Sequence, residues 1–364
     1  MAMQFSHIRE KQALKLYEEG MKAGEATAFR FMGNCYALGS CGLKQDKEKA
    51  FQYYAQAREA TRISMATANI AFCYLDGAGV NKDEARGLEI LREADEQGHP
   101  SARCWLGVFR LYGKYGLEKD EAKAFKLISE AYEKHNKTAA YYLGECYLFG
   151  KHVAVDSEKA VRYYLEAAES DIAEAQLRLA NCYHDGTGVA RNQKESLRWY
   201  RLAADNGSVA AMHNLAVALE NGNGTEVDKK QAYKYFRQAA EGGLPDSMCA
   251  VARYHTFAQG GIKKDYKEGF TWYRKAGEAG NVMGILGTAW YYENGWYVDR
   301  NRNKALEWFR KGADLNQPDC LYYMGVYYRD GLGGLKKDKA KAREWMEKAA
   351  EAGQPDAVRD LKNL

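Results

Sequence analysis

Residues Ala173 to Ser208 read AEAQLRLANCYHDGTGVARNQKESLRWYRLAADNGS, and this stretch predicts two amphipathic helices joined by a turn. In its first half, small and apolar residues recur at steps of three and four, which places them on one helical face. Gly186 and Gly188 end that helix because glycine tolerates the positive φ that stops one. Asn192 is positioned to cap a second helix. The stretch therefore predicts a helical hairpin.

The same pattern recurs nine times, at intervals of about 36 residues, and such self-similarity indicates a repeat architecture. The units begin at Ala26, Ser64, Pro100, Lys137, Ala173, Val209, Pro245, Val282 and Pro318. An Asp or Asn stands where each second helix should begin: Asp46, Asp83, Asp120, Asp156, Asn192, Asp228, Asp265, Asn301 and Asp338. The recurrence predicts an all-α solenoid in which each hairpin packs on its neighbours.

Two further columns hold small residues, which allow two helices to cross closely. In the first helices the column is Gly33, Ala71, Gly107, Gly144, Ala180, Ala216, Ala252, Ala289 and Gly325. In the second helices it is Ala50, Gly87, Ala124, Ala160, Ser196, Ala232, Gly269, Ala305 and Ala342. We expect each hairpin to be held together where these columns meet.

The unbroken period favours one elongated solenoid domain over residues 1–364 rather than several globular domains. Within it, residues 1–25 form an N-terminal half-repeat, because the spacing from Arg9 to Ala23 indicates a second helix without its partner. Residues 26–354 form the nine repeats, and residues 355–364 form a C-terminal capping helix. We therefore expect about twenty helices in all.

The composition fits an ordered protein with a continuous core, since 46% of the residues are hydrophobic and 28% are charged. A net charge of +4, from 53 basic and 49 acidic residues, argues against nucleic-acid binding, which usually needs a concentrated basic stripe. The first residues lack the apolar region of a secretory signal, and no run is long enough for a membrane span. We expect a cytoplasmic protein.

Three segments carry a recognisable motif: Met32 to Tyr36 (MGNCY), Leu143 to Tyr147 (LGECY) and Lys304 to Phe309 (KALEWF). These segments and the columns around them resemble the Sel-1-like repeat, a relative of the tetratricopeptide repeat, over essentially the whole chain. The resemblance implies a right-handed α–α superhelix of about nine hairpins with a capping half-repeat at each end. It also implies a non-catalytic scaffold or adaptor that binds a partner protein or peptide. We expect a monomer without cofactor or metal.

The motif search supports a non-enzymatic role, because the sequence has no Cys-x-x-Cys, His-Glu-x-x-His, Gly-x-Ser-x-Gly or phosphate-loop motif. One alternative comes from cysteine-rich members of the family, which are associated with weak hydrolase activity or β-lactam binding. This chain has no Ser-x-x-Lys motif to support that role. The other alternative, a nucleic-acid-binding solenoid, would need a basic concave surface.

The eight cysteines indicate packing rather than a disulfide framework. Cys35, Cys73, Cys146 and Cys182 share one place in their units, and equivalent points on adjacent units lie about 8–10 Å apart, beyond the roughly 7 Å Cα limit of a disulfide. We interpret them as small buried apolar residues of a protein from a reducing compartment. Within one unit, only a Cys35–Cys41 disulfide remains as an alternative.

The partner-binding residues are predicted from the resemblance, which implies that the first helix of each hairpin lines the concave face of the superhelix. Transferring the binding places by register gives an apolar set: Phe72, Leu75, Val108, Leu111, Tyr112, Tyr141, Leu148 and Phe149. The later units give a polar, mostly acidic set: Asn181, His184, Asp185, His213, Glu220, Asn221, Arg253, Phe257, Trp290, Glu293, Asn294, Tyr322, Arg329 and Asp330.

Together the two sets predict a groove that is apolar towards its N-terminal half and polar towards its C-terminal half. A peptide with a hydrophobic anchor followed by basic residues would complement it. The alternative is that the curvature of the superhelix partly buries the apolar set between neighbouring repeats.

Overall fold

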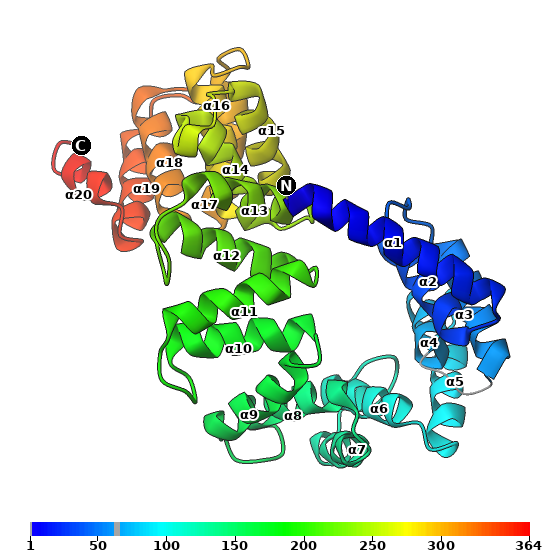
Figure 1. Ribbon diagram of the computed structural model, residues 1–364. Coiled ribbons are helices and arrows are strands. Elements are labelled where there is room, and N and C mark those ends of the chain that lie inside the picture. Colours follow the sequence, from blue (N-terminus) through cyan, green and yellow to red (C-terminus); the bar gives the residue numbers. More distant parts are fainter. Residues whose placement is uncertain (1, 62–65) are drawn as a thin grey trace. The chain divides into compact units, whose positions relative to one another are not determined.

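The computed structural model describes residues 2–61 and 66–364, and all regular structure in these ranges is helical (Figure 1). The first helices of hairpins 1 to 9 are α2 (Ala26–Leu38), α4 (Ala66–Asp76), α6 (Pro100–Tyr112), α8 (Lys137–Phe149), α10 (Ala173–Asp185), α12 (Val209–Asn221), α14 (Pro245–Phe257), α16 (Val282–Asn294) and α18 (Pro318–Asp330). The second helices are α3 (Lys47–Thr61), α5 (Glu84–Glu96), α7 (Glu121–Glu133), α9 (Ser157–Ala168), α11 (Gln193–Asp205), α13 (Lys229–Glu241), α15 (Tyr266–Glu278), α17 (Arg302–Asp314) and α19 (Lys339–Glu351).

Helix α1 (Ala2–Lys22) precedes the hairpins, and α20 (Pro355–Leu361) follows them, while a 3₁₀ turn, η1 (Gln259–Gly261), interrupts the seventh. The prediction of an all-α solenoid of nine hairpins flanked by half-repeats is therefore confirmed. Helix α1 begins nearer the N-terminus than the spacing predicts. The predicted unit start at Ser64 lies outside the described residues.

The chain divides into two compact units within the fifth hairpin. The first comprises Met1–Ala175 and Thr187–Val189, and the second comprises Gln176–Gly186 and Ala190–Leu364. A single solenoid domain over residues 1–364 stays a prediction.

The predicted caps are confirmed in all nine hairpins, because each Asp or Asn accepts a hydrogen bond from a backbone N–H of the second helix. In hairpin 3, for example, Asp120 Oδ1 accepts from the N–H of Lys123 at 2.9 Å. Such a bond satisfies one of the donors that a helix leaves open at its N-terminus. Local sequence therefore decides where each second helix begins.

The small columns meet as predicted, and a large side chain of the second helix fills the crossing. This filling column is Tyr54, Leu91, Ile128, Tyr164, Tyr200, Phe236, Phe309 and Met346, all buried, and the equivalent residue of hairpin 7, Tyr273, is half-buried. A Cβ atom on Gly144 would lie 2.6 Å from the Tyr164 ring, so the ring would have to shift before this position could carry a side chain. The core of each hairpin thus depends on one small and one large partner.

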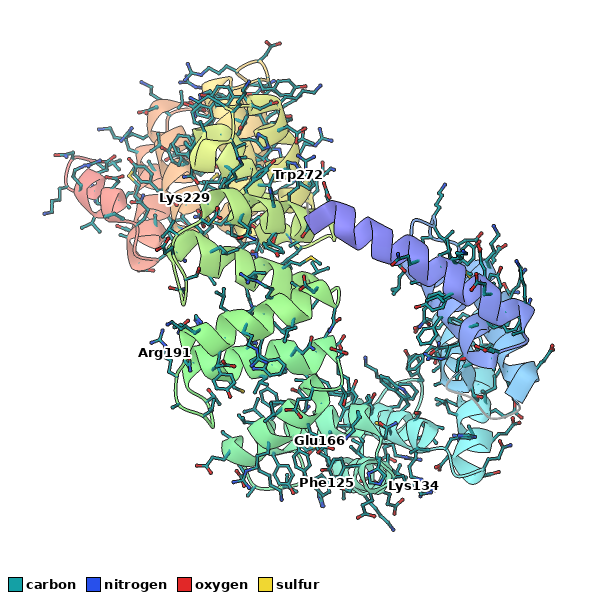
Figure 2. The ribbon with its side chains drawn as sticks, viewed as in Figure 1. Phe125, Lys134, Glu166, Arg191, Lys229 and Trp272 are labelled. Atoms are coloured by element: carbon teal, nitrogen blue, oxygen red, sulfur yellow. The ribbon has the colours of Figure 1, made fainter. Side chains whose placement is uncertain are left out.

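Polar contacts link neighbouring hairpins along the second helices. Glu166 of α9, labelled in Figure 2, accepts hydrogen bonds of 2.7 Å from both the Tyr132 hydroxyl and Lys137 Nζ. Tyr132 belongs to α7 and Lys137 begins α8, so the carboxylate joins hairpins 3 and 4. On α7, Phe125 packs edge-on against Tyr147 of α8, with ring centroids 6.0 Å apart.

Candidate partner-binding surface

The last residue of each first helix forms a row that we call the helix-end row. The residue after it has a left-handed backbone in all nine hairpins, which ends the helix. The row is Leu38, Asp76, Tyr112, Phe149, Asp185, Asn221, Phe257, Asn294 and Asp330. Its four apolar members are exposed by 77% (Leu38), 41% (Tyr112), 52% (Phe149) and 57% (Phe257). The sequence analysis named most of this row. It missed Leu38 because its predicted sets began with the second hairpin, and it missed Asp76 because it assigned no residue of that hairpin to this position.

Tyr112 and Phe149 occupy equivalent positions on adjacent hairpins 3 and 4. Lys151 Nζ lies 4.3 Å from the centroid of the Tyr112 ring and 5.7 Å from that of Phe149, and it donates a 3.2 Å hydrogen bond to Tyr112 Oη. Cation–π contacts at exposed sites contribute about 0.5–1 kcal/mol each. We call these three residues the aromatic patch, since the lysine holds two exposed rings in place.

Half-buried aromatic rings also lie on α4, α6 and α8, and the last two of these helices carry the two rings of the aromatic patch. Phe72 meets Trp105 edge-on at 4.8 Å, and Trp105 meets Tyr142 at 5.8 Å between ring centroids. Tyr141 in turn meets Tyr142 at 4.9 Å. Sequence reasoning named Phe72 and Tyr141 but missed Trp105 and Tyr142, although both stand two residues before the small column. These rings rigidify α4, α6 and α8 at the surface.

The predicted apolar set needs correction at three positions. Leu75, Val108 and Leu111 are 0%, 4% and 1% exposed, so they offer a partner no surface. Leu75, for example, faces its own second helix, where a Cβ atom on Gly87 would lie 2.6 Å from Leu75 Cγ. The register transfer placed these residues in the groove, whereas the closeness of the paired helices buries them. Leu148 is half-buried.

Two of the predicted acidic residues, Glu220 and Glu293, are paired with arginines. Glu220 accepts two hydrogen bonds from Arg253 Nη2, at 2.8 and 2.9 Å, across hairpins 6 and 7. Glu293 pairs with Arg300 and Arg302 at 3.2 Å and also accepts from the Tyr327 hydroxyl. Both carboxylates are only about one-seventh exposed. Arginines of the fold therefore neutralise much of the acidic charge in the polar half of the predicted groove. This weakens the expectation that a partner binds there through basic residues.

The predicted histidines also have partners inside the fold. His184 Nδ1 lies 3.1 Å from Gln193 Oε1, and its Nε2 lies 4.0 Å from Asp185. His213 Nδ1 lies 2.8 Å from Ser247 Oγ, and burial lowers the pKa of the His213 imidazole. These contacts favour a structural role for both imidazoles.

Arg329 ties the capping helix α20 to hairpin 9. Its guanidinium pairs with Asp330 at 2.9 Å and with Asp360 Oδ2 at 3.0 Å, and Asp360 also accepts from the Tyr322 hydroxyl at 2.9 Å. Burial acts to raise the pKa of the Asp360 carboxyl, but hydrogen bonds from Tyr322, Arg359 and Arg329 outweigh it and hold that pKa below its usual range. The charged form of Asp360 is therefore the stabilising one.

A pH dependence follows from this network. A carboxyl with a lowered folded-state pKa stabilises fully above its unfolded pKa, about 3.9 for Asp, and this contribution is lost as the pH falls further. At pH 7 we expect Asp360→Asn to lower the free energy of unfolding by about 1–2 kcal/mol. Urea unfolding of both proteins at pH 7, 5 and 3 should show the difference shrinking only at the lowest value. A difference that is independent of pH would contradict the assignment.

An apolar pocket of about 260 Å³ lies in hairpins 7 and 8. Its walls are formed mainly by aromatic residues, Phe257, Tyr273, Trp290, Tyr291 and Trp296 among them. Its floor includes Gly287, at the position where hairpins 3 and 4 carry Trp105 and Tyr142. Two residues predicted for binding, Phe257 and Trp290, border it.

Among the described residues, no three His, Cys, Asp or Glu side chains are grouped so that they could hold a metal ion. In the same ranges, no helix combines the length and the apolar character that crossing a membrane requires.

The stacked hairpins with their exposed helix ends define an α-solenoid of the interaction-scaffold class. The Sel1 repeat model matches residues 30–61, 64–99, 100–136, 137–171, 173–208, 209–244, 245–281, 283–317 and 318–354, and the chain belongs to the Sel1 repeat family. Proteins of this family generally mediate protein–protein interactions, and the repeat is generally a non-catalytic scaffold.

Two solved structures are similar over much of the chain. One is c5321, a protective antigen present in uropathogenic Escherichia coli strains, at 27% identity and a TM-score of 0.56 over 96% of this chain and 81% of that one. The other is a Sel1 repeat protein from Oxalobacter formigenes, at 28% identity and a TM-score of 0.60 over 68% of this chain and 96% of that one.

A shorter similarity exists to the ERAD-associated E3 ubiquitin-protein ligase component HRD3B of Arabidopsis thaliana. It is 33% identical over 93 residues, which are 25% of this chain. The match spans only 14% of the length of that relative.

Proposed function

We propose that the chain is a non-catalytic adaptor that binds a peptide segment of a partner protein along its first helices, with the aromatic patch as the anchor point. The observation that carries the proposal is the exposure of Tyr112 and Phe149, two large rings at equivalent positions of adjacent hairpins. Aromatic residues dominate the binding energy of protein interfaces, because they bury much area at little conformational cost. The family's general role in protein–protein interaction supports the same reading.

The spacing of the patch suggests the form of the bound segment. Helices α6 and α8 contact each other, so equivalent positions on them lie about 8–10 Å apart. An extended peptide covers about 10 Å in three residues, and a helix covers about 10 Å in seven. A bound segment would therefore contact both rings with two apolar side chains that are about three residues apart if it is extended, or about seven residues apart if it is helical. Lys151 beside the rings favours an acidic group next to these anchors.

The decisive variant replaces Tyr112 and Phe149 together by alanine. A protein retained from native lysate by the unaltered chain is identified and purified, and its dissociation constant is measured by calorimetry with each bait. We expect the double variant to bind about 10–100-fold more weakly, since each lost anchor costs about 1–2 kcal/mol.

Leu165→Ala is the matched control, because Leu165 is 36% exposed on α9, the second helix of the same hairpin. It should bind like the unaltered chain, and circular dichroism should show equal helicity for all baits. Equal affinity of the double variant and the unaltered chain would reject the aromatic patch as the anchor.

A further inference from the structure

Hairpin 1 brings two cysteine sulfurs together. Cys35 lies in the last turn of α2, Cys41 lies in the turn that follows, and their Sγ atoms are 3.0 Å apart. A disulfide bond measures about 2.05 Å, so closing the bond takes a movement of about 1 Å. Both residues are reduced in the structure.

The backbone of the turn holds Cys41 against the helix. Gly39 takes a left-handed conformation with φ 66°, and the N–H of Ser40 donates to the Cys35 carbonyl at 3.0 Å, which folds the chain back over the last helical turn. Cys41 itself has φ 57°, a region that is unfavourable for residues with a Cβ. At the same position five other hairpins carry glycine: Gly79, Gly188, Gly224, Gly260 and Gly333.

Hairpin 3 shows independently that the repeat sets these two positions against each other. Phe109 and Tyr115 stand at the positions equivalent to Cys35 and Cys41, and their rings are in contact with centroids 4.7 Å apart. Tyr115 has the same left-handed backbone, with φ 53°. The closeness of the two sulfurs is thus a property of the fold, and in hairpin 1 both positions happen to be cysteine.

The two sulfurs differ in access. Cys41 is half-buried, whereas Cys35 is only 4% exposed. We propose that Cys35 and Cys41 form a reversible disulfide by exchange with a low-molecular-weight disulfide such as oxidised glutathione.

The exchange proceeds in two displacements. The Cys41 thiolate attacks one sulfur of oxidised glutathione, which forms a mixed disulfide and releases one glutathione thiolate. Cys35 then loses its proton and attacks the Cys41 sulfur, which forms the Sγ–Sγ bond and releases the second glutathione. Two protein thiols are oxidised, and one glutathione disulfide is reduced to two thiols.

The bond would tie the last turn of α2 to the turn that leads to α3. Leu38, the most exposed apolar member of the helix-end row, lies between the two cysteines. Oxidation therefore restrains the backbone on both sides of Leu38.

The chain offers a direct readout. Cleavage after Lys and Arg yields a peptide of residues 31–44 that contains Cys35 and Cys41 and no other cysteine. The folded protein is equilibrated in glutathione buffers of rising oxidised fraction, quenched with acid, denatured and alkylated, and the peptides are analysed by mass spectrometry. Cys249, the other half-buried cysteine, lies in the peptide of residues 238–253 and serves as the internal control.

We expect peptide 31–44 to lose both alkylation sites together and to weigh two hydrogen atoms less than the dithiol. Conversion of half of the Cys35–Cys41 pairs to the disulfide should need a ratio of oxidised to reduced glutathione at least tenfold lower than the ratio at which half of Cys249 is modified. In Cys41→Ser, checked for unchanged helicity, Cys35 should remain alkylated throughout. Three outcomes would overturn the proposal. They are a lasting glutathione adduct on Cys41, a disulfide between two chains, and full alkylation of both cysteines at the ratios of oxidised to reduced glutathione that modify Cys249.

Discussion

Replacing Phe309 by alanine is expected to lower the free energy of unfolding by about 3–5 kcal/mol, because a fully buried aromatic ring leaves a cavity when it is removed. Phe309 is 0% exposed on α17. Its ring stacks on Tyr323 with centroids 4.8 Å apart and meets Tyr327 at 5.6 Å, both on α18. The Phe309 ring therefore joins hairpins 8 and 9. Its removal deprives α18 of a packing partner.

Urea unfolding followed by circular dichroism measures the effect. In a solenoid each repeat is stabilised mainly by its neighbours, so we expect the loss to appear first as an earlier transition of the C-terminal hairpins. Phe257→Ala is the matched control, since that ring is 57% exposed and its removal should cost less than about 1 kcal/mol. Equal losses for the two variants would show that Phe309 does not hold the interface.

The second large effect is expected at the crossing of α8 and α9. Gly144→Leu should destabilise the protein by about 3 kcal/mol, because overpacking forces side chains out of their rotamers. The clash is with Tyr164, which is fully buried and whose hydroxyl donates to Glu145 at 2.7 Å. That ring cannot turn aside without giving up its hydrogen bond.

Gly144→Ala is the control for this prediction. A methyl group at Gly144 requires a shift of the Tyr164 ring, and hairpin 5 shows that the repeat can make room for it, because Ala180 stands at the equivalent position opposite the buried ring of Tyr200. Alanine also favours a helix over glycine by about 1 kcal/mol, which offsets the crowding. We expect a change within about 1 kcal/mol, and thermal unfolding should separate the two variants clearly. A leucine variant as stable as the alanine variant would mean that the crossing is loose.

Much of the fold could be predicted because its determinants are local. An Asp or Asn caps each second helix through a backbone N–H two or three residues away, and a residue with left-handed backbone ends each first helix. The small columns recur at helical spacing, so their meeting needs no knowledge of distant parts of the chain. These features survive in every hairpin and determine the class of protein.

The candidate site could be predicted only in part. The exposure of Tyr112 and Phe149 agrees with the expected apolar surface, whereas Leu111, one residue away from Tyr112, is buried. Adjacent residues on a helix point about 100° apart, so a small error in the crossing angle exchanges a surface position for a core position. Periodicity identifies a face of the helix but not the edge of that face.

The charged residues show the same limit. The sequence analysis placed Glu220 and Glu293 in a polar, mostly acidic half of a groove, while the fold pairs them with Arg253 and Arg302. The partner of Glu220 lies 33 residues further along the chain, in the next hairpin. The sequence by itself determined the hairpins, their caps and their crossings, because those depend on neighbouring residues. Only the tertiary structure decided which side chains remain exposed and which charges neutralise each other, because these depend on how successive helices stack.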